Sequence, residues 1–195
     1  MPGYPSAIRV FTLTHSRRNV VQRYPWLISF SLDVVARANV FADLRAKYFD
    51  IPRPQEVPAP ASPDEPWAAV IEIAYPASTL TTVAFTDGTA RVLRSTGGGF
   101  FAAGVVEPVR PAAEAFVREA QHQNSRFTSA SEFPQPEIGQ VFFYTRSDSQ
   151  VRTAAASEAE LHSRTHVLSP LYFAGLRILH EFLQLQKASE QQRNT

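Results

Sequence analysis

Alternation of apolar and polar residues is the most regular pattern in this chain, and it predicts the strands of a β-sheet. Every second side chain of a strand lies on the same face, so a strand with one buried face alternates. By this pattern we expect strands at residues 67–75, 80–85, 89–94, 140–146 and 150–155. In the first strand, one face would be formed by Trp67, Ala69, Ile71, Ile73 and Tyr75. Two turns, Asp87-Gly88 and Ser147–Ser149, join the later strands into hairpins. Asp87-Gly88 favours a type I′ turn, in which both central residues have φ > 0.

Apolar residues recur at helical spacing in three other segments. Residues 26–49 carry an apolar stripe formed by Leu27, Phe30, Val34, Ala38, Phe41, Leu44 and Tyr48. Residues 107–122 are also predicted to be helical, and Pro111 indicates that the regular part begins a turn later. The last helix is expected at about 169–186, with Ser169 as its N-cap.

The order of these elements predicts the fold class. From residue 67 onward the order is β-β-β-α-β-β-α. Two hairpins and two amphipathic helices predict an α+β fold, in which a five-stranded, mainly antiparallel sheet carries packed helices. The chain would then have four parts: an N-terminal extension (1–51), a proline-rich linker (52–66), the α+β domain (67–187) and a disordered tail (188–195).

The linker is assigned from its composition. It contains six prolines. Proline lacks an amide donor and biases the preceding residue toward extended backbone, so a regular element is excluded. We therefore predict that a chain without residues 1–60 still folds. The alternative is that the apolar stripe of the first helix packs across the sheet and completes its core.

Composition restricts the class of protein and its partners. The chain is 44% hydrophobic and 19% charged, as expected of a globular protein. Its net charge of +1 gives no reason to expect nucleic acid or an anionic membrane as partner. Without cysteine there is no disulfide and no thiolate chemistry. The apolar run 26–42 is interrupted by five polar residues, so a membrane span is not expected. Ser16-Arg17-Arg18 resembles a twin-arginine signal but lacks a clean cleavage site, and a cytoplasmic location is expected.

A glycine-rich loop is the first candidate for a ligand site. It follows the first hairpin and consists of Ser95, Thr96, Gly97, Gly98 and Gly99. Successive amides of such a loop can converge on an anion. The nucleotide-binding motifs do not fit, because Phe100-Phe101 stands where a P-loop has Lys-Ser or Lys-Thr. The alternative is a structural loop, in which the glycines permit a bulge or a close backbone crossing.

Catalytic and metal-binding patterns are weak elsewhere. His162 and His166 have the i,i+4 spacing of a helical metal site, with Glu158 and Glu160 nearby, but Arg164 between them disfavours a cation. Ser95 does not lie in the G-x-S-x-G motif of a nucleophilic serine. We therefore assign no catalytic residues, no metal ligands and no cofactor.

Several segments together resemble a group of small uncharacterised bacterial proteins. These segments are the DGT hairpin, STGGG, the alanine-rich helix, the phenylalanine-tyrosine strand and the S-P-L sequence of the last helix. The resemblance covers about residues 67–183 and implies no activity. The order of elements is also similar to that of roadblock, longin and profilin-like modules, which implies an adaptor or dimerisation role. That similarity is of topology alone.

From these observations we expect a non-enzymatic protein-interaction or regulatory module with a protein partner or a homodimer. Its sheet would be able to extend through a free edge. A small-ligand or anion-binding domain using the loop from Ser95 to Gly99 is the alternative. A hydrolase-type enzyme using Ser95, Thr96 or the pair His162 and His166 is the third.

Overall fold

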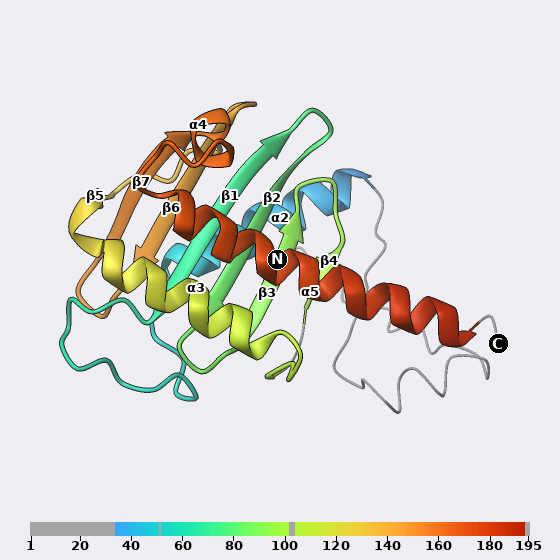
Figure 1. The fold of residues 1–195 in the computed structure, drawn as a ribbon, viewed down its shortest axis with the longest axis horizontal. Helices are drawn as coiled ribbons and strands as arrows, with labels where there is room; N and C mark the ends of the chain where they lie inside the picture. Colours follow the sequence, from blue (N-terminus) through green and yellow to red (C-terminus); the bar gives the residue numbers. More distant parts are fainter. Residues whose placement is uncertain (1–33, 51, 102–103, 194–195) are drawn as a thin grey trace, which may run out of the picture.

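The computed structural model describes residues 34–50, 52–101 and 104–193 (Figure 1). Residues 1–33, and with them the start of the predicted first helix, lie outside this part. The fold is α+β, as predicted, with one antiparallel sheet in the order β4-β3-β2-β1-β6-β7-β5. The strands are β1 (Ala68–Tyr75), β2 (Ser78–Phe85), β3 (Ala90–Arg94), β4 (Gly99–Phe100), β5 (Thr128–Ser129), β6 (Gln140–Arg146) and β7 (Val151–Ser157).

The predicted number of five strands is wrong, because the sheet has seven. The two additional strands, β4 and β5, form its two edges and have two residues each. A two-residue strand contains no alternation, so the sequence pattern had no means of indicating either one.

Helices cover both faces of the sheet, giving three layers (Figure 1). On one face lie α3 (Arg110–Gln123) and α5 (Ser169–Arg193), which we call the α3/α5 face. On the opposite face lies α2 (Val34–Asp50), which defines the α2 face. The short helices η2 (Asn124–Arg126) and α4 (Glu158–His162) lie beyond the ends of strands. No helix in the described residues has the length and apolar content needed to cross a bilayer.

The core of the α3/α5 face follows from the predicted alternation. Ala69, Ile71 and Ile73 of β1 point to this face and are each 2% exposed or less. They pack with apolar side chains of both helices, among them Phe116, Leu171, Ile178 and Phe182. Gly175 brings α5 close to the sheet, since a Cβ there would lie 2.9 Å from Cγ2 of Ile71.

The core of the α2 face is built mainly from aromatic residues. Phe41, Tyr48 and Phe49 of α2 pack against the sheet, as the alternative interpretation of the apolar stripe required. Trp67 was predicted on the same face as Ala69, but that is wrong. The strand begins one residue later, at Ala68, and Trp67 lies in the α2-face core, stacked on Phe85 at 6.2 Å between ring centroids.

The proline-rich segment 52–66 has neither helix nor strand, as its composition predicts, but it is bound to the domain. Val57 is 2% exposed and belongs to the α2-face core. The turn between β6 and β7 holds the other end, because the hydroxyl of Ser149 donates to Asp64 at 2.6 Å. The segment therefore belongs to the folded unit together with α2.

The turn at Asp87-Gly88 differs from the predicted type I′. The amide of Gly88 donates to the carbonyl of Phe85 at 3.0 Å, and the amide of Phe85 donates to Thr89 at 3.0 Å. These bonds enclose a three-residue loop, in which only Gly88 has positive φ (+82°). This is a type I turn followed by a glycine bulge, and its additional residue makes the type I′ prediction wrong.

The last helix begins at Ser169, as predicted, but the cap at its start and its C-terminal end differ from expectation. The amide of Tyr172 donates to the carbonyl of Leu168, so the first helical bond begins one residue before Ser169. The Ser169 hydroxyl is buried and has no partner in the described residues, which means that it does not cap the helix as predicted. At the other end α5 continues to Arg193, into the predicted tail, and its last turns extend beyond the sheet (Figure 1).

Candidate functional site

The glycine-rich loop forms the turn between β3 and β4. The amide of Gly97 donates to the carbonyl of Arg94 at 2.9 Å, and the amide of Arg94 donates to Gly98 at 3.1 Å. This is the same three-residue loop with a glycine bulge that joins β2 to β3. The amide of Ser95 donates to the carbonyl of Thr79 at 2.9 Å. Two amides of the predicted anion cradle, those of Ser95 and Gly97, therefore already donate to carbonyls of the chain itself.

Each glycine of this loop has a backbone reason to be there. Gly97 and Gly98 have φ of +90° and +81°, which residues with a Cβ rarely adopt. Gly99 has φ of +147°, and a Cβ at this position would lie 2.0 Å from the carbonyl oxygen of Val92. The Ser95 hydroxyl accepts a bond from the amide of Thr79 at 2.8 Å, while Thr96 is exposed at the tip. Anion binding by this loop stays a prediction.

The two histidines considered as metal ligands do not share a helical face. The helix α4 ends at His162, and Arg164 follows with φ of +62°. His166 lies beyond this bend, where its Nδ1 accepts a bond from the amide of Leu168 at 3.2 Å. In the part of the chain that the structure describes, no three His, Asp or Glu side chains come together to hold a metal ion.

A buried ion pair under α2 is the feature that the sequence reasoning missed. Glu72 of β1 is fully buried and accepts two bonds from Arg45 of α2, at 2.7 and 2.6 Å. The hydroxyl of Thr81 donates to the same carboxylate at 2.7 Å. Arg45 also donates to the carbonyls of Phe133 and Pro134, at 2.8 and 3.0 Å. Because all these groups are partnered, the cluster holds α2 and the loop at 133–134 against the sheet.

Tyr144 completes this cluster, and its raised pKa indicates that the cluster is shielded from water. Its hydroxyl donates to the carbonyl of Pro134 at 3.1 Å, and its ring lies edge-on to Phe49. Burial is the main cause that raises the pKa of Tyr144, and the negative charge of Glu72 adds to it. Burial lowers the pKa of Arg45, but the hydrogen bonds to Glu72, its negative charge and Tyr144 together outweigh this effect, so the pKa is raised. The cluster keeps Tyr144 neutral and Arg45 charged, so it is not poised for proton transfer near neutral pH.

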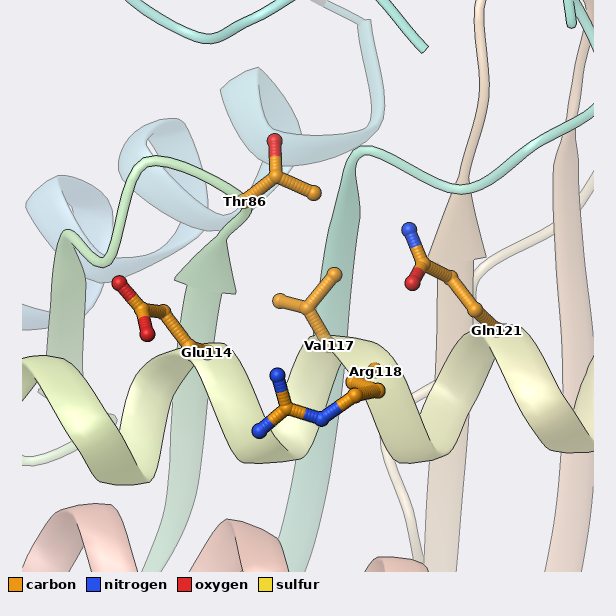
Figure 2. Close-up of a pocket in the computed structure, with 5 residues that line it drawn as sticks. All are labelled: Thr86, Glu114, Val117, Arg118 and Gln121. Carbon is orange, nitrogen blue, oxygen red and sulfur yellow. The ribbon is translucent and has the colours of Figure 1, made fainter. Parts of the chain in front are cut away.

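Among the described residues, two of the cavities that open to the surface have lining residues that bear on function. The first, of about 200 Å³, lies between α3 and the turn that joins β2 to β3, and its lining residues are shown in Figure 2. They are Thr86, Glu114, Val117, Arg118 and Gln121. Gln121 donates to the carbonyl of Pro66, so its amide group is already used. The second cavity, of about 300 Å³, lies between the proline-rich segment and the turn that joins β6 to β7. None of the five residues of the glycine-rich loop lines either cavity.

The outer edge of β7 is only partly covered. β5 pairs with Arg152 and Thr153, and the amide of Ala130 donates to the carbonyl of Val151 at 3.0 Å. Because this carbonyl points away from β6, the backbone groups of every second residue, including Ala155 and Ser157, point outward too. Ser157 is also the N-cap of α4, so its carbonyl accepts the first bond of that helix. No strand in the described residues pairs with this part of the edge.

Comparison with known proteins adds no relative. No family model matches the chain, and neither the curated proteins nor the solved structures contain a significant match.

Proposed function

We propose that this protein is a non-enzymatic interaction module that pairs with a second copy of itself through the free edge of β7. The observation that supports this proposal is the uncovered part of that edge, Ala154–Ser157, with the outward backbone groups of Ala155 and Ser157. Open edges of this kind add a further strand readily.

The composition of the edge supports pairing. Proteins usually protect an open edge with charged residues or proline, and Ala154–Ser157 contains neither. The short side chains of the three alanines also leave room for a neighbouring strand. The two-residue strand β5 shows that an extended segment already adds to this edge in antiparallel orientation.

A second copy fits because an antiparallel edge pairs with itself about a two-fold axis. With the axis at Ala156, Ala155 of one copy would lie opposite Ser157 of the other, twice. The two pairs would exchange about four backbone hydrogen bonds, two of them as second bonds to the Ser157 carbonyls, which also accept the first bond of α4. β5 occupies the edge at Arg152 and Thr153, and this axis places opposite them partner residues that lie beyond the end of β7 at Ser157, in α4.

The test is the oligomeric state of the full chain, measured by sedimentation velocity over a range of concentrations. We expect a concentration-dependent dimer that Ala155→Pro abolishes. Proline at this position removes an amide that points outward, so it takes no hydrogen bond from the β6–β7 ladder. Ala155→Val is the matched control, since it keeps the amide and suits a strand, and it should dimerise.

Two results would overturn the proposal: a wild-type chain that stays monomeric, or a dimer that persists in Ala155→Pro. If Ala155→Pro does not fold, amide hydrogen exchange of the wild type decides. The amides of Ala155 and Ser157 should become protected as the concentration rises, and unchanged exchange would count against the edge.

A further inference from the structure

We propose that the second cavity is a binding site for a small organic oxyanion, a carboxylate or a phosphomonoester. This inference goes beyond the proposed function and does not depend on it. The cavity is lined by Pro52, Arg53, Trp67, Arg146, Ser147 and Asp148. Its volume of about 300 Å³ exceeds that of a single water molecule or a bare ion, and small-molecule sites begin at about this size.

The charges of the lining favour an anion. Among the residues that line the cavity are two guanidinium groups, of Arg53 and Arg146, and one carboxylate, that of Asp148. The carboxylate of Asp50 also acts on Arg146 but does not line the cavity. Arg53 donates through Nε to Asp148 at 3.1 Å and through Nη1 to the carbonyl of Val57 at 2.7 Å. These two bonds fix the guanidinium and leave Nη2 without a partner among the described residues. Guanidinium groups suit carboxylate and phosphate oxygens because their donors form a planar fork.

Arg146 supplies a second cation in a partly dry position. Its guanidinium lies over the ring of Trp67, 5.7 Å from the ring centroid. Burial lowers the pKa of Arg146, and the negative charge of Asp50 opposes this effect only in part. A bound anion would offset the remaining cost of keeping this charge away from water.

Trp67 provides a donor for which the chain has no acceptor. It lines the cavity, is 1% exposed, and its indole Nε1 has no hydrogen-bond partner in the described residues. A buried donor without a partner is unfavourable, so such groups are rare and need a reason. Because Nε1 is itself buried, an oxygen of the ligand would become its acceptor only after a small displacement of the side chains around Trp67, while Pro52 would contact the organic part of the ligand.

The test uses the fluorescence of Trp67. The chain has two tryptophans, so the Trp26→Phe variant serves as background, in which Trp67 alone emits. This full-length protein is titrated with phenyl phosphate, benzoate, inorganic phosphate and, as control, sodium chloride at constant ionic strength. We expect a saturable change with phenyl phosphate or benzoate and none with chloride. The probe that binds more tightly distinguishes a phosphomonoester from a carboxylate.

Matched arginine variants separate a site from a general charge effect. Arg146→Gln should weaken binding at least tenfold. Arg118→Gln removes the same charge from an exposed position on α3 and should leave binding unchanged. An equal effect of both variants, or no saturable change with either organic probe, would overturn the proposal.

If Arg146→Gln fails to fold, Arg53→Gln replaces it with the same expectation. The indole N–H resonance of Trp67 in the nitrogen–proton spectrum provides an independent readout in the unmutated cavity. It should shift progressively on addition of the better organic probe, and a stationary resonance would refute the assignment.

Discussion

The two faces of the sheet are covered in different ways. On the α3/α5 face, apolar side chains of the strands meet apolar side chains of two helices that follow the first strands in the chain. On the α2 face, the covering helix precedes the sheet and is joined to it by the proline-rich segment, and the interface contains the ion pair of Arg45 and Glu72. The first face shows how a periodic pattern specifies packing. The second shows a helix held in place by a specific polar contact.

Removal of the whole α2 layer should have the largest effect on the comparison of the two faces. A chain of residues 61–195 lacks Phe41, Tyr48, Phe49 and Val57, and it leaves the carboxylate of Glu72 without Arg45. We expect it to lose cooperative thermal unfolding and to bind a hydrophobic dye, because an apolar sheet face and a charge are exposed together. The sequence alone predicted the opposite. A sharp unfolding transition close to that of the full chain would restore the two-part organisation.

The next test addresses the ion pair alone. Glu72→Ala leaves the guanidinium of Arg45, 9% exposed, without its carboxylate, so the free energy of unfolding should fall by about 3–5 kcal/mol. Glu107→Ala breaks the exposed pair with Arg110 and should cost less than about 1 kcal/mol. Denaturant unfolding of the two variants measures both values.

A double variant sharpens the same test. Arg45→Met with Glu72→Met replaces the buried charges with apolar side chains of similar length and should recover most of the stability lost in Glu72→Ala. If the double variant is as unstable as Glu72→Ala, the ion pair itself adds to the free energy of unfolding, and its role is not limited to each charge neutralising the other.

The edge strand β4 provides a smaller test on the α3/α5 side. Phe100 of β4 stacks on Phe182 of α5 at 5.0 Å between ring centroids, and Gly99 brings the strand close to β3. Gly99→Ala places a Cβ against the carbonyl of Val92, and we expect a loss of about 1–3 kcal/mol. Gly104→Ala is the matched control, since a Cβ there meets no atom within 4 Å. Equal melting temperatures of the two variants would contradict the close approach.

The smallest expected effect appears only at high pH. Burial, followed by the charge of Glu158, raises the pKa of Tyr172 from 10.0 to about 12. The hydroxyl donates to that carboxylate at 3.3 Å. Between these pH values the unfolded chain loses the proton while the folded chain keeps it, so stability should fall as the pH rises. The melting temperature of Tyr172→Phe should decline less over this range than that of the wild type, and parallel curves would show that Tyr172 is not the group responsible.

Sequence periodicity predicted the strands and helices that pack against other elements with the same alternation or helical spacing of apolar residues. The bounds of β6 were predicted without error, and the buried positions Ala69, Ile71 and Ile73 follow the alternation. The register of the loop at Asp87-Gly88 was wrong by one residue, because a type I′ turn and a type I turn with a glycine bulge use the same dipeptide. A single additional residue in the loop distinguishes them, and the pattern of the flanking strands does not fix it.

The candidate sites were harder to predict. Glu72 is the one charge in the strand Ala68–Tyr75, and this alone indicates a partnered carboxylate. The sequence does not say that the partner is Arg45, since that contact depends on where α2 packs. The second cavity joins Arg53 from the proline-rich segment with Trp67 and Arg146 from two different strand ends. These three residues are far apart in the chain, and no regular spacing between them predicts that they lie together.

The central position of β1 has a consequence for the rate of folding. Ala68 pairs with Phe85 in β2, which follows closely in the chain, and with Arg146 in β6, which follows much later. Loop-closure entropy grows with the length of chain enclosed, so we expect the hairpin strands β1–β3 to associate first and β6 to add last. Until β6 arrives, one edge of the most apolar strand is open. A nascent or refolding chain is therefore most prone to aggregate in this interval, and folding at low concentration should give a higher yield.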